Sequence, residues 1–279
     1  LESTGLSPII LADPKNFITL SQQIKLYDNI GRLSKNTTIG LSQGQQIMPH
    51  HHGVWGYAMQ TSANLGQALC IFNQYFDVVG PMAKQMIQVE GKLARWISKD
   101  ILPLGIGRRV AIEEMLSGNF TLFRQLTEQK FELKALYVDY EAPIGFEAYE
   151  ELFQRPIYFE QNKVEMHFDA SLLNLRMRYS DPETVRVCEE SCIKLLKKIS
   201  GSKNIVEQVR QIIYESSCDE RDIDTVSGKL YMSSRTLRRQ LSKEKSTFRK
   251  VLNEVLKAVA IDYLSSTDLS VDEISYLLG

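Results

Sequence analysis

Apolar side chains recur every three or four positions along several stretches of the N-terminal part of the chain. Because an α-helix turns once in about 3.6 residues, this spacing places them on one face of an amphipathic helix. Ser62 is the expected N-cap of one such helix, since a serine side chain accepts a hydrogen bond at a helix start. The predicted helices cover residues 17–33, 62–79, 105–130 and 181–199.

Other stretches alternate between apolar and polar residues with a period of two, which is typical of strands. Residues 86–97 alternate around Glu90–Gly91 and predict a hairpin. Residues 131–140 and 156–168 are rich in aromatic and β-branched side chains, and the second stretch is expected to turn at Gln161–Asn162. Together, the predicted helices and strands indicate an α+β domain with helices packed on a small, mostly antiparallel sheet.

A short polar break, SGSKN at residues 200–204, divides the chain. With 279 residues, of which 43% are hydrophobic, the chain is long enough for two domains with cores of their own. We expect residues 1–200 to form the α+β domain and residues 201–279 to form a second, all-helical domain.

The segment Ile223–Leu241 has the pattern of two short helices joined by a turn. Ser233 is placed as the N-cap of the second helix, in which Leu237 and Leu241 lie four positions apart on one face. At about 100° per residue, Arg235 and Arg239 fall opposite these leucines. Arginine can present two donors to guanine O6 and N7 or clamp a phosphate, so this face suits the major groove of DNA.

Basic residues are concentrated around this second helix, although the whole chain has a net charge of −1. Between positions 229 and 250 they are opposed only by Glu244. A solvated helix surface is the alternative explanation, but a cluster of one sign in a neutral chain is typical of a nucleic-acid-binding surface. The cluster consists of Lys229, Arg235, Arg238, Arg239, Lys243, Lys245, Arg249 and Lys250.

The rest of the chain continues this helical pattern. Residues 247–264 carry an apolar helical stripe, and residues 269–279 then begin like another unit. Ser270 is a predicted N-cap, with Glu273 three residues later to complete a capping box. The residues expected on its core face are Ile274, Leu277 and Leu278, with Gly279 as its turn.

The motif SxRTLxRxL at Ser233–Leu241 and the sequence LSVDEISYLLG at Leu269–Gly279 resemble the tandem helix-turn-helix domain of the AraC/XylS family of bacterial transcription regulators. The resemblance implies a cytoplasmic, sequence-specific regulator, most simply an activator. Its partner would be double-stranded promoter DNA, with RNA polymerase as a further candidate. The residues expected to contact DNA are Ser234, Arg235, Arg238, Arg239 and Lys243.

The sequence departs from this family pattern in three ways. Tyr231 and Lys245 stand where the family usually has glycine; if the backbone is left-handed there, each costs on the order of 1 kcal/mol. Leu256 replaces an arginine that is common in the linker helix of the family, so the phosphate or structural contact of that arginine is not expected here. The sequence ends at Gly279, before a second recognition helix, so the tandem domain is incomplete and we expect weak DNA binding.

Residues 48–81 resemble the signature HxGxxGYA…SxxLGxAL of an arabinose-binding-like sensor domain, found in regulators related to ornithine and arginine responders. The resemblance implies that residues 1–200 bind a small-molecule effector and form a homodimer. The helix-rich start gives no support for a sugar site, so amino acids, fatty acids and other metabolites all remain open as effectors.

A regulator whose first domain only dimerises and binds no ligand is the alternative. The helix at residues 65–79 is the candidate dimer contact, because Phe72, Tyr75 and Phe76 extend beyond one buried stripe; otherwise these rings pack inside the domain. A further set of aromatic residues is expected either to line an apolar effector pocket or to fill the core of the domain. The set consists of Tyr137, Tyr140, Phe146, Tyr149, Phe153, Tyr158 and Phe159.

A His-dependent metal enzyme is a remote alternative. Consecutive residues such as His50–His52 point in different directions, and His167 has no nearby Cys or HxxxH partner. We expect His52 and Gly53 to belong to a tight loop that leads into Gly56 and Tyr57 instead. The sequence has no GxSxG, GxxxxGK[ST], GxGxxG or HExxH pattern, so no catalytic residue, metal or cofactor is expected.

Membrane insertion and export are not expected either. No apolar run approaches the ~20 residues of a membrane-spanning helix, and Leu1–Ile10 lacks the basic start of a signal peptide. The four cysteines contain no CxxC pair. Cys188 and Cys192 lie four positions apart on a predicted helix and are expected to be neighbouring buried thiols.

Overall fold

The computed structural model describes residues 1, 3–12, 18–76, 82–100, 104–202, 205–216, 220–266 and 269–278. The chain divides into two compact units, Leu1–Lys99 with Ile106–Lys198, and Ile199–Gly279 with Asp100–Gly105. The polar break predicted at residues 200–204 begins as helix, because α8 (Pro182–Ser202) continues to Ser202. Residues 203 and 204 lie outside the described residues.

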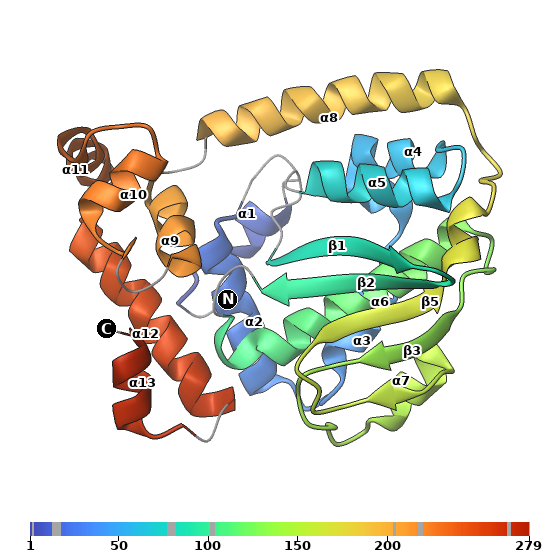
Figure 1. Cartoon of the computed structure of the whole chain (residues 1–279), viewed down its shortest axis with the longest axis horizontal. Helices are drawn as coiled ribbons and strands as arrows, with labels where there is room; N and C mark the ends of the chain where they lie inside the picture. The colour runs from blue at the N-terminus through green and yellow to red at the C-terminus, as the bar shows by residue number, and fades with distance from the viewer. Residues whose placement is uncertain are drawn as a thin grey trace. The chain divides into compact units, whose positions relative to one another are not determined.

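The first unit combines helices with one sheet, as the sequence predicts (Figure 1). Its helices are α1 (Pro8–Ala12), α2 (Leu20–Leu33), α3 (Ile39–Gly44), α4 (Gly53–Gln60), α5 (Leu65–Tyr75), α6 (Arg108–Leu126), α7 (Glu147–Phe153) and most of α8. Its strands are β1 (Ala83–Glu90), β2 (Leu93–Asp100), β3 (Leu133–Tyr137), β4 (Ile157–Tyr158) and β5 (Val164–Asp169). Short 3-10 turns lie at η1 (Pro49–His52), η3 (Gly105–Gly107) and η4 (Ala170–Asn174).

The five strands are ordered β1-β2-β5-β3-β4. Strand β5 pairs antiparallel with both β2 and β3, and β4 pairs parallel with β3. The chain reverses direction between β4 and β5, so the turn expected at Gln161–Asn162 is present, but the two strands are not paired with each other. Because β5 is buried along nearly its whole length and both its edges are already hydrogen-bonded, β4 joins the free edge of β3, where the Val138 N–H donates to the Tyr158 carbonyl.

Helix α5 begins two residues later than the sequence predicts. Its N-cap is Asn64, whose Oδ1 accepts a hydrogen bond from the Gln67 N–H at 2.9 Å. Ser62 is not a cap: its hydroxyl donates to the carbonyl of Ala58, at the end of the preceding helix. Helix α5 is described to Tyr75, and the last residues of the predicted helix, 77–79, lie outside the described residues.

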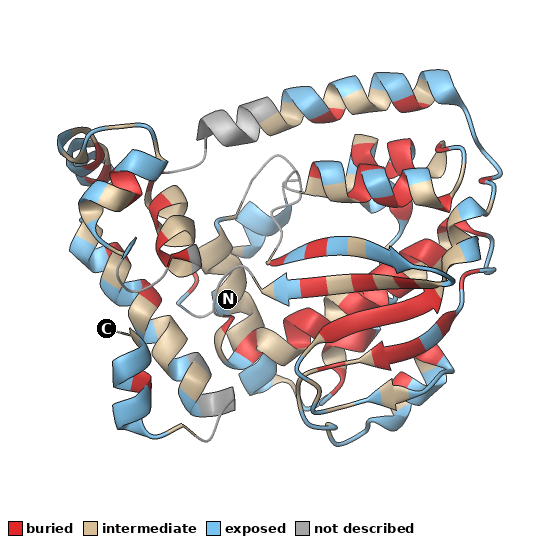
Figure 2. Ribbon diagram, in the orientation of Figure 1, coloured by how far each residue is buried: buried red, intermediate tan, exposed pale blue. Residues whose placement is uncertain are grey.

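The core of the first unit lies between the sheet and helices α5 and α6, where Figure 2 shows most of the buried residues. Trp96 on β2 is fully buried, and its ring centroid lies 5.2 Å from those of both Phe72 and Phe123. The indole N–H of Trp96 donates to Gln85 Oε1 at 2.6 Å. Aromatic rings from two helices and a strand thus fill one continuous core.

Close contacts at Gly44 and Gly56 in this unit leave no room for a Cβ. A Cβ at Gly44 on α3 would lie 1.9 Å from Ser117 Oγ on α6. A Cβ at Gly56 would lie 1.8 Å from the carbonyl oxygen of Pro49. His52 and Gly53 form the expected tight turn: His52 ends a 3-10 turn, Gly53 has a φ of 56°, and helix α4 follows directly. Gly56 permits the turn and the helix to pack together.

The second unit contains α9 (Ile205–Glu215), α10 (Ile223–Lys229), α11 (Ser234–Lys243), α12 (Phe248–Ser266) and α13 (Val271–Leu278). It is all-helical over its described residues from 205 onward. Its buried core is separate from that of the first unit and consists of Ile205, Val209, Ile213, Val226, Leu237, Leu241, Val251 and Val255. None of the described helices of either unit is long and apolar enough to cross a membrane.

Candidate nucleic-acid interface

Helices α10 and α11 form the predicted helix-turn-helix, and each has a side-chain cap. Asp222 Oδ1 accepts hydrogen bonds from the N–H groups of Asp224 and Thr225 at 2.8 and 3.0 Å. Ser233 Oγ accepts from the Thr236 N–H at 3.2 Å, so the predicted cap of α11 is confirmed. Hydrogen bonding, chiefly with Thr225, holds the pKa of Asp222 below its ordinary value. The caps fix where both helices begin.

The leucine face of α11 is buried and its arginine face is exposed. Leu237 and Leu241 are both fully buried in the core of the second unit. The residues predicted to contact DNA lie on the other side, where Ser234 is half-buried and the four cations are exposed. Within the described residues, no hydrogen bond or ion pair engages the side chains of these cations, which are Arg235, Arg238, Arg239 and Lys243.

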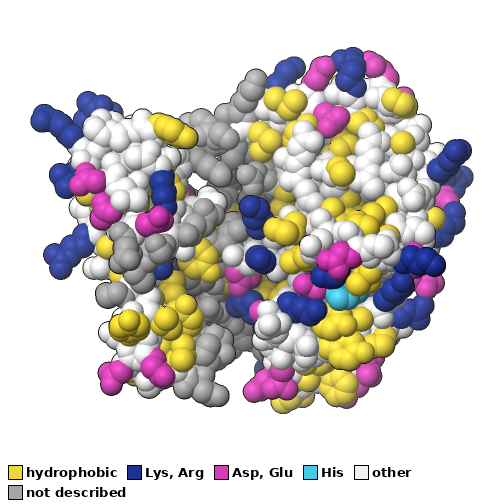
Figure 3. Space-filling model, viewed as in Figure 1, with side chains coloured by type: hydrophobic (Ala, Val, Ile, Leu, Met, Phe, Trp, Pro, Cys, Tyr) yellow, Lys and Arg dark blue, Asp and Glu magenta, His cyan; other side chains and the backbone are white. Residues whose placement is uncertain are grey.

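Lys229 does not belong to this exposed cationic surface. Its ammonium pairs with Glu220 at 2.8 Å and donates a hydrogen bond to Ser216 Oγ. The basic residues beyond α11, Lys245, Arg249 and Lys250, are exposed. Figure 3 shows dark blue Lys and Arg side chains gathered at the edge of the second unit where Figure 1 places α11.

Helices α12 and α13 follow the predicted pattern with one exception. The capping box is confirmed, because the Ser270 N–H donates to Glu273 Oε2 at 2.8 Å and the Glu273 N–H donates to Ser270 Oγ at 3.3 Å. Ile274 is buried and Leu278 is half-buried, but Leu277 is 45% exposed and is not a core residue. Helix α13 packs on α12, and Leu277 lies about 60° around the helix axis from Ile274, so the contact that buries Ile274 does not bury Leu277. Gly279 lies outside the described residues.

The histidines have structural partners in the first unit. The ring of His52 packs against Trp55 with centroids 4.7 Å apart, and burial lowers the pKa of His52 to about 4. His51 Nδ1 accepts a hydrogen bond from the Met48 N–H. His167 pairs with Glu165 at 2.7 Å. Among the described residues, no group of three or more His, Cys, Asp or Glu side chains is arranged to hold a metal ion.

The cysteines differ from one another in exposure. Cys192 is buried and Cys188 is half-buried, and both are free thiols. Burial raises the pKa of Cys192 to about 11. Cys70 is exposed, and Cys218 lies outside the described residues.

The aromatic residues of α5 pack inside the first unit, which is the alternative to the dimer contact that the sequence suggests. Phe72 and Tyr75 are each 2% exposed. Phe76 stacks on Phe72 with centroids 4.8 Å apart and also contacts Trp55. The apolar stripe is wider than one helix face because α5 is covered by neighbours on more than one side.

Most of the aromatic residues considered for an effector pocket belong to the core. Tyr149 and Phe153 are buried, and Tyr140 and Phe159 pack against the same core. Tyr137 stacks on Tyr158 with centroids 4.9 Å apart at the outer edge of the sheet. Four of these rings therefore belong to the core or pack against it, whereas Tyr158 and Phe146 are partly exposed at the surface.

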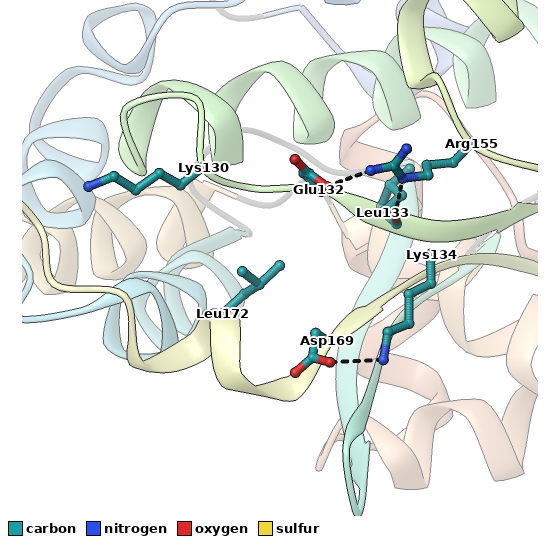
Figure 4. Close-up of a pocket in the computed structure, with 7 residues that line it drawn as sticks. All are labelled: Lys130, Glu132, Leu133, Lys134, Arg155, Asp169 and Leu172. Atoms are coloured by element: carbon teal, nitrogen blue, oxygen red, sulfur yellow. Dashed lines mark hydrogen bonds and ion pairs between the residues drawn. The ribbon is translucent and has the colours of Figure 1, made fainter.

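A charged depression of about 340 Å³ lies in the first unit instead (Figure 4). Arg155 pairs with Glu132 at 2.5 Å, and Lys134 pairs with Asp169 at 2.9 Å. The hydrogen bond from Lys134 holds the pKa of Asp169 well below its ordinary value. Sequence reasoning missed this site because its residues come from separate strands and turns. They are Lys130, Glu132, Leu133, Lys134, Arg155, Asp169 and Leu172.

A capped helix with an exposed arginine face, in a helical unit that follows an α+β unit, is the organisation of a DNA-binding regulator. The sequence profile of the arabinose-binding N-terminal domain of AraC transcription regulators matches residues 1–177. The chain therefore belongs to the AraC family of transcription regulators and is not an enzyme.

Several known proteins are similar to the chain. It is 27% identical over 278 residues to the ornithine utilization regulator of Pseudomonas aeruginosa, covering 100% of this chain and 82% of that protein. It is 36% identical over 80 residues to the transcriptional activator PerA of Escherichia coli, covering 29% of each. The crystal structure of the regulator CdpR from Pseudomonas aeruginosa superposes with a TM-score of 0.52 and 20% identity over 92% of this chain and 84% of that one, which supports the fold alone.

Proposed function

We propose that this regulator binds promoter DNA through the exposed face of α11 and activates transcription in response to a small-molecule effector. The main support for this proposal is that four exposed cations on α11 have no hydrogen-bond or ion-pair partner among the described residues. Burial of Leu237 and Leu241 and the cap at Ser233 hold this face outward. A rigid, positively charged helix face is what major-groove binding requires.

We expect each cation to make a different contact with DNA, according to its position along α11. Arg235 lies in the first turn, and N-terminal residues of a recognition helix are those that contact base edges. Arg238 and Arg239 lie one turn later, where their side chains would contact bases or phosphates. Lys243 is the last residue of the helix and suits a phosphate. Ser234 opens the helix, where its hydroxyl can donate to a phosphate or base.

The test uses a duplex that the wild-type chain selects from a randomised library. Replacing Arg235, Arg238 or Arg239 by alanine should weaken binding to that duplex by about 1 to 3 kcal/mol each, as measured by fluorescence anisotropy. Repeating the selection with each variant should relax sequence preference at one position for a base-contacting arginine. Lys194→Ala, which removes an exposed charge from α8, is the matched control and should bind like wild type.

Unchanged affinity in all three arginine variants would contradict the assignment of α11 as the DNA-binding helix. A uniform loss over selected and random duplexes would instead assign the arginine concerned to a phosphate rather than to a base.

The effector is proposed to be a small polar molecule with charges of both signs, bound in the charged depression. The ion pairs Arg155–Glu132 and Lys134–Asp169 offer a donor set and an acceptor set within one site of about 340 Å³. The name of the ornithine utilization regulator mentions an amino acid with this charge pattern. An effector that prefers one state of the protein shifts its population by that preference.

Thermal unfolding in the presence of ornithine and of arginine tests the effector site. Binding to the native state should raise the melting temperature of the wild-type chain, and the double variant Lys134→Ala, Asp169→Ala should lose this shift. A shift that is equal in wild type and variant would place the effector elsewhere. Absence of a shift with both amino acids would contradict the proposed effector class.

Self-association through the first unit is also proposed, because a dimer presents two DNA-binding surfaces and raises affinity through effective concentration. Sedimentation velocity of the whole chain at tens of micromolar decides the matter. A dimer supports the proposal, and a monomer at that concentration contradicts a strong dimer.

A further inference from the structure

Both helices of the helix-turn-helix end in the same backbone arrangement. After α10, the Tyr231 N–H donates to the Gly228 carbonyl and the Met232 N–H donates to the Ser227 carbonyl, at 2.9 and 3.0 Å. After α11, the Lys245 N–H donates to the Ser242 carbonyl at 3.0 Å. These are Schellman motifs, in which the first residue beyond the C-cap adopts a left-handed conformation.

Tyr231 and Lys245 occupy these left-handed positions, with φ angles of 54° and 53°. Glycine is favoured there because a Cβ crowds the backbone, at a cost of about fivefold in the folding equilibrium. Among the described non-glycine residues with positive φ, Tyr231 is the aromatic one. A bulky residue in this conformation is an outlier that calls for a compensating role of its side chain.

Packing does not compensate the cost at Tyr231. Its residue surface is 99% exposed, the highest fraction among the exposed large hydrophobic residues, and its ring makes no contact with a described aromatic ring. Lys245 is exposed as well, and its ammonium has no described ion pair. Neither side chain therefore stabilises the fold that holds it in place.

The two residues bracket α11. Tyr231 lies two positions before its N-cap Ser233, and Lys245 lies two positions after its last residue, Lys243. Between them lies the cationic face assigned to DNA, and exposed Arg249 follows in α12. A phenol hydroxyl and an ammonium are both donors that phosphate oxygens accept, and contacts to phosphates are what fix the register of a recognition helix.

We propose that Tyr231 and Lys245 are phosphate contacts that position α11 in the major groove, the hydroxyl donating to one phosphate and the ammonium pairing with another. The proposal rests on the proposed function of α11. DNA is the partner favoured over a protein surface, because the two residues flank exposed cations that have no acidic partner among the described residues.

Glycine substitution tests the proposal, since it keeps the backbone and removes only the side chain. Tyr231→Gly and Lys245→Gly in the whole chain should each raise the folding equilibrium constant severalfold and lower affinity for the selected duplex about tenfold. Gln154→Gly is the matched control. Gln154 is the left-handed C-cap of α7 with a φ of 53°, and its replacement should stabilise the fold without changing DNA affinity.

Two further measurements separate the roles of the side chains. Tyr231→Phe keeps the ring and the backbone cost, so stability should stay constant while affinity falls if the hydroxyl donates to phosphate. Lys245→Gly should reduce the slope of log affinity against log salt by about 0.9, whereas Tyr231→Gly should leave that slope unchanged because tyrosine is neutral.

The possible outcomes distinguish this inference from the proposed function. More stable glycine variants with unchanged DNA affinity, alongside arginine variants of α11 that lose affinity, overturn the inference and leave the function standing. If the arginine variants also bind like wild type, the proposed function fails and the inference fails with it.

Discussion

The hydroxyl of Tyr149 donates a hydrogen bond to Glu113 Oε1 at 2.8 Å inside the core of the first unit. Both residues are fully buried. Arg109 donates to the same carboxyl at 3.3 Å, and the Tyr140 hydroxyl lies 3.0 Å from that of Tyr149. A carboxyl group thus lies at the centre of a core that also contains aromatic rings, and its donors offset only part of the cost of burying it.

Removing the hydroxyl of Tyr149 is expected to destabilise the first unit. Tyr149→Phe preserves the ring but leaves Glu113 with one donor fewer, and an incompletely satisfied buried group costs about 1 to 3 kcal/mol. Urea denaturation measures the loss. Tyr158→Phe is the matched control, because this tyrosine is 46% exposed and its hydroxyl has no described partner. Equal stability of the two variants would mean that the Glu113 hydrogen bond contributes nothing.

Glu113 makes stability depend on pH. Burial raises its pKa above the ordinary 4.5, although Tyr149 and Arg109 act in the opposite direction. Because the folded state holds this proton more tightly than the unfolded state, the contribution is fully present below pH 4.5 and is lost as pH rises through the folded pKa.

The variant Glu113→Gln should therefore show a shallower decline of unfolding free energy above pH 4.5 than wild type. Glu114, whose pKa is also raised by burial, retains part of the decline. Urea titrations at several pH values measure the slope, and Glu150→Gln at an exposed position should leave it as in wild type. A steeper decline in Glu113→Gln would reverse the assigned sign.

The contact between α3 and α6 predicts a strong effect at Gly44. Gly44→Ala places a Cβ 1.9 Å from Ser117 Oγ and 2.3 Å from the Glu114 carbonyl oxygen, so the helices must separate. We expect a loss of about 1 to 3 kcal/mol in unfolding free energy. Gly228→Ala meets nothing within 4 Å and should instead stabilise α10 by up to about 1 kcal/mol. Differential scanning calorimetry of both variants checks the opposite signs.

The cap of α11 predicts a smaller effect. Ser233→Ala removes the acceptor of the Thr236 N–H and should cost about 0.5 to 2 kcal/mol. Ser242→Ala on the same helix is exposed, so it should be neutral or slightly stabilising. Hydrogen exchange at the Thr236 amide reports the change locally, and unaltered protection in Ser233→Ala would show that the cap does not hold the helix start.

Helices α10 to α13 of the second unit could be predicted from sequence because their signals are local, whereas α9 was not predicted. The caps Ser233 and Ser270 each act over three residues, and Leu237 and Leu241 mark a face without knowledge of their neighbours. The left-handed backbone at Tyr231 was anticipated only from the family glycine at that position.

The sheet order could not be predicted, because it depends on contacts between distant strands. Nothing near Gln161–Asn162 indicates that β3 lies between β4 and β5. The charged depression could not be predicted for the same reason, because Lys134 and Asp169 meet only in the folded sheet. The prediction that Leu277 is buried was wrong, because the width of a buried stripe is set by the packing partner and not by the helix itself.

The salt dependence of binding tests whether α11 forms the DNA-binding surface. The triple variant Arg235→Ala, Arg238→Ala, Arg239→Ala and the wild-type chain are titrated against one random-sequence duplex over a series of salt concentrations. We expect weaker binding by the variant and a slope of log affinity against log salt that is shallower by about 0.9 for each arginine that neutralises a phosphate. Equal affinity and equal slopes for the two proteins would contradict this expectation.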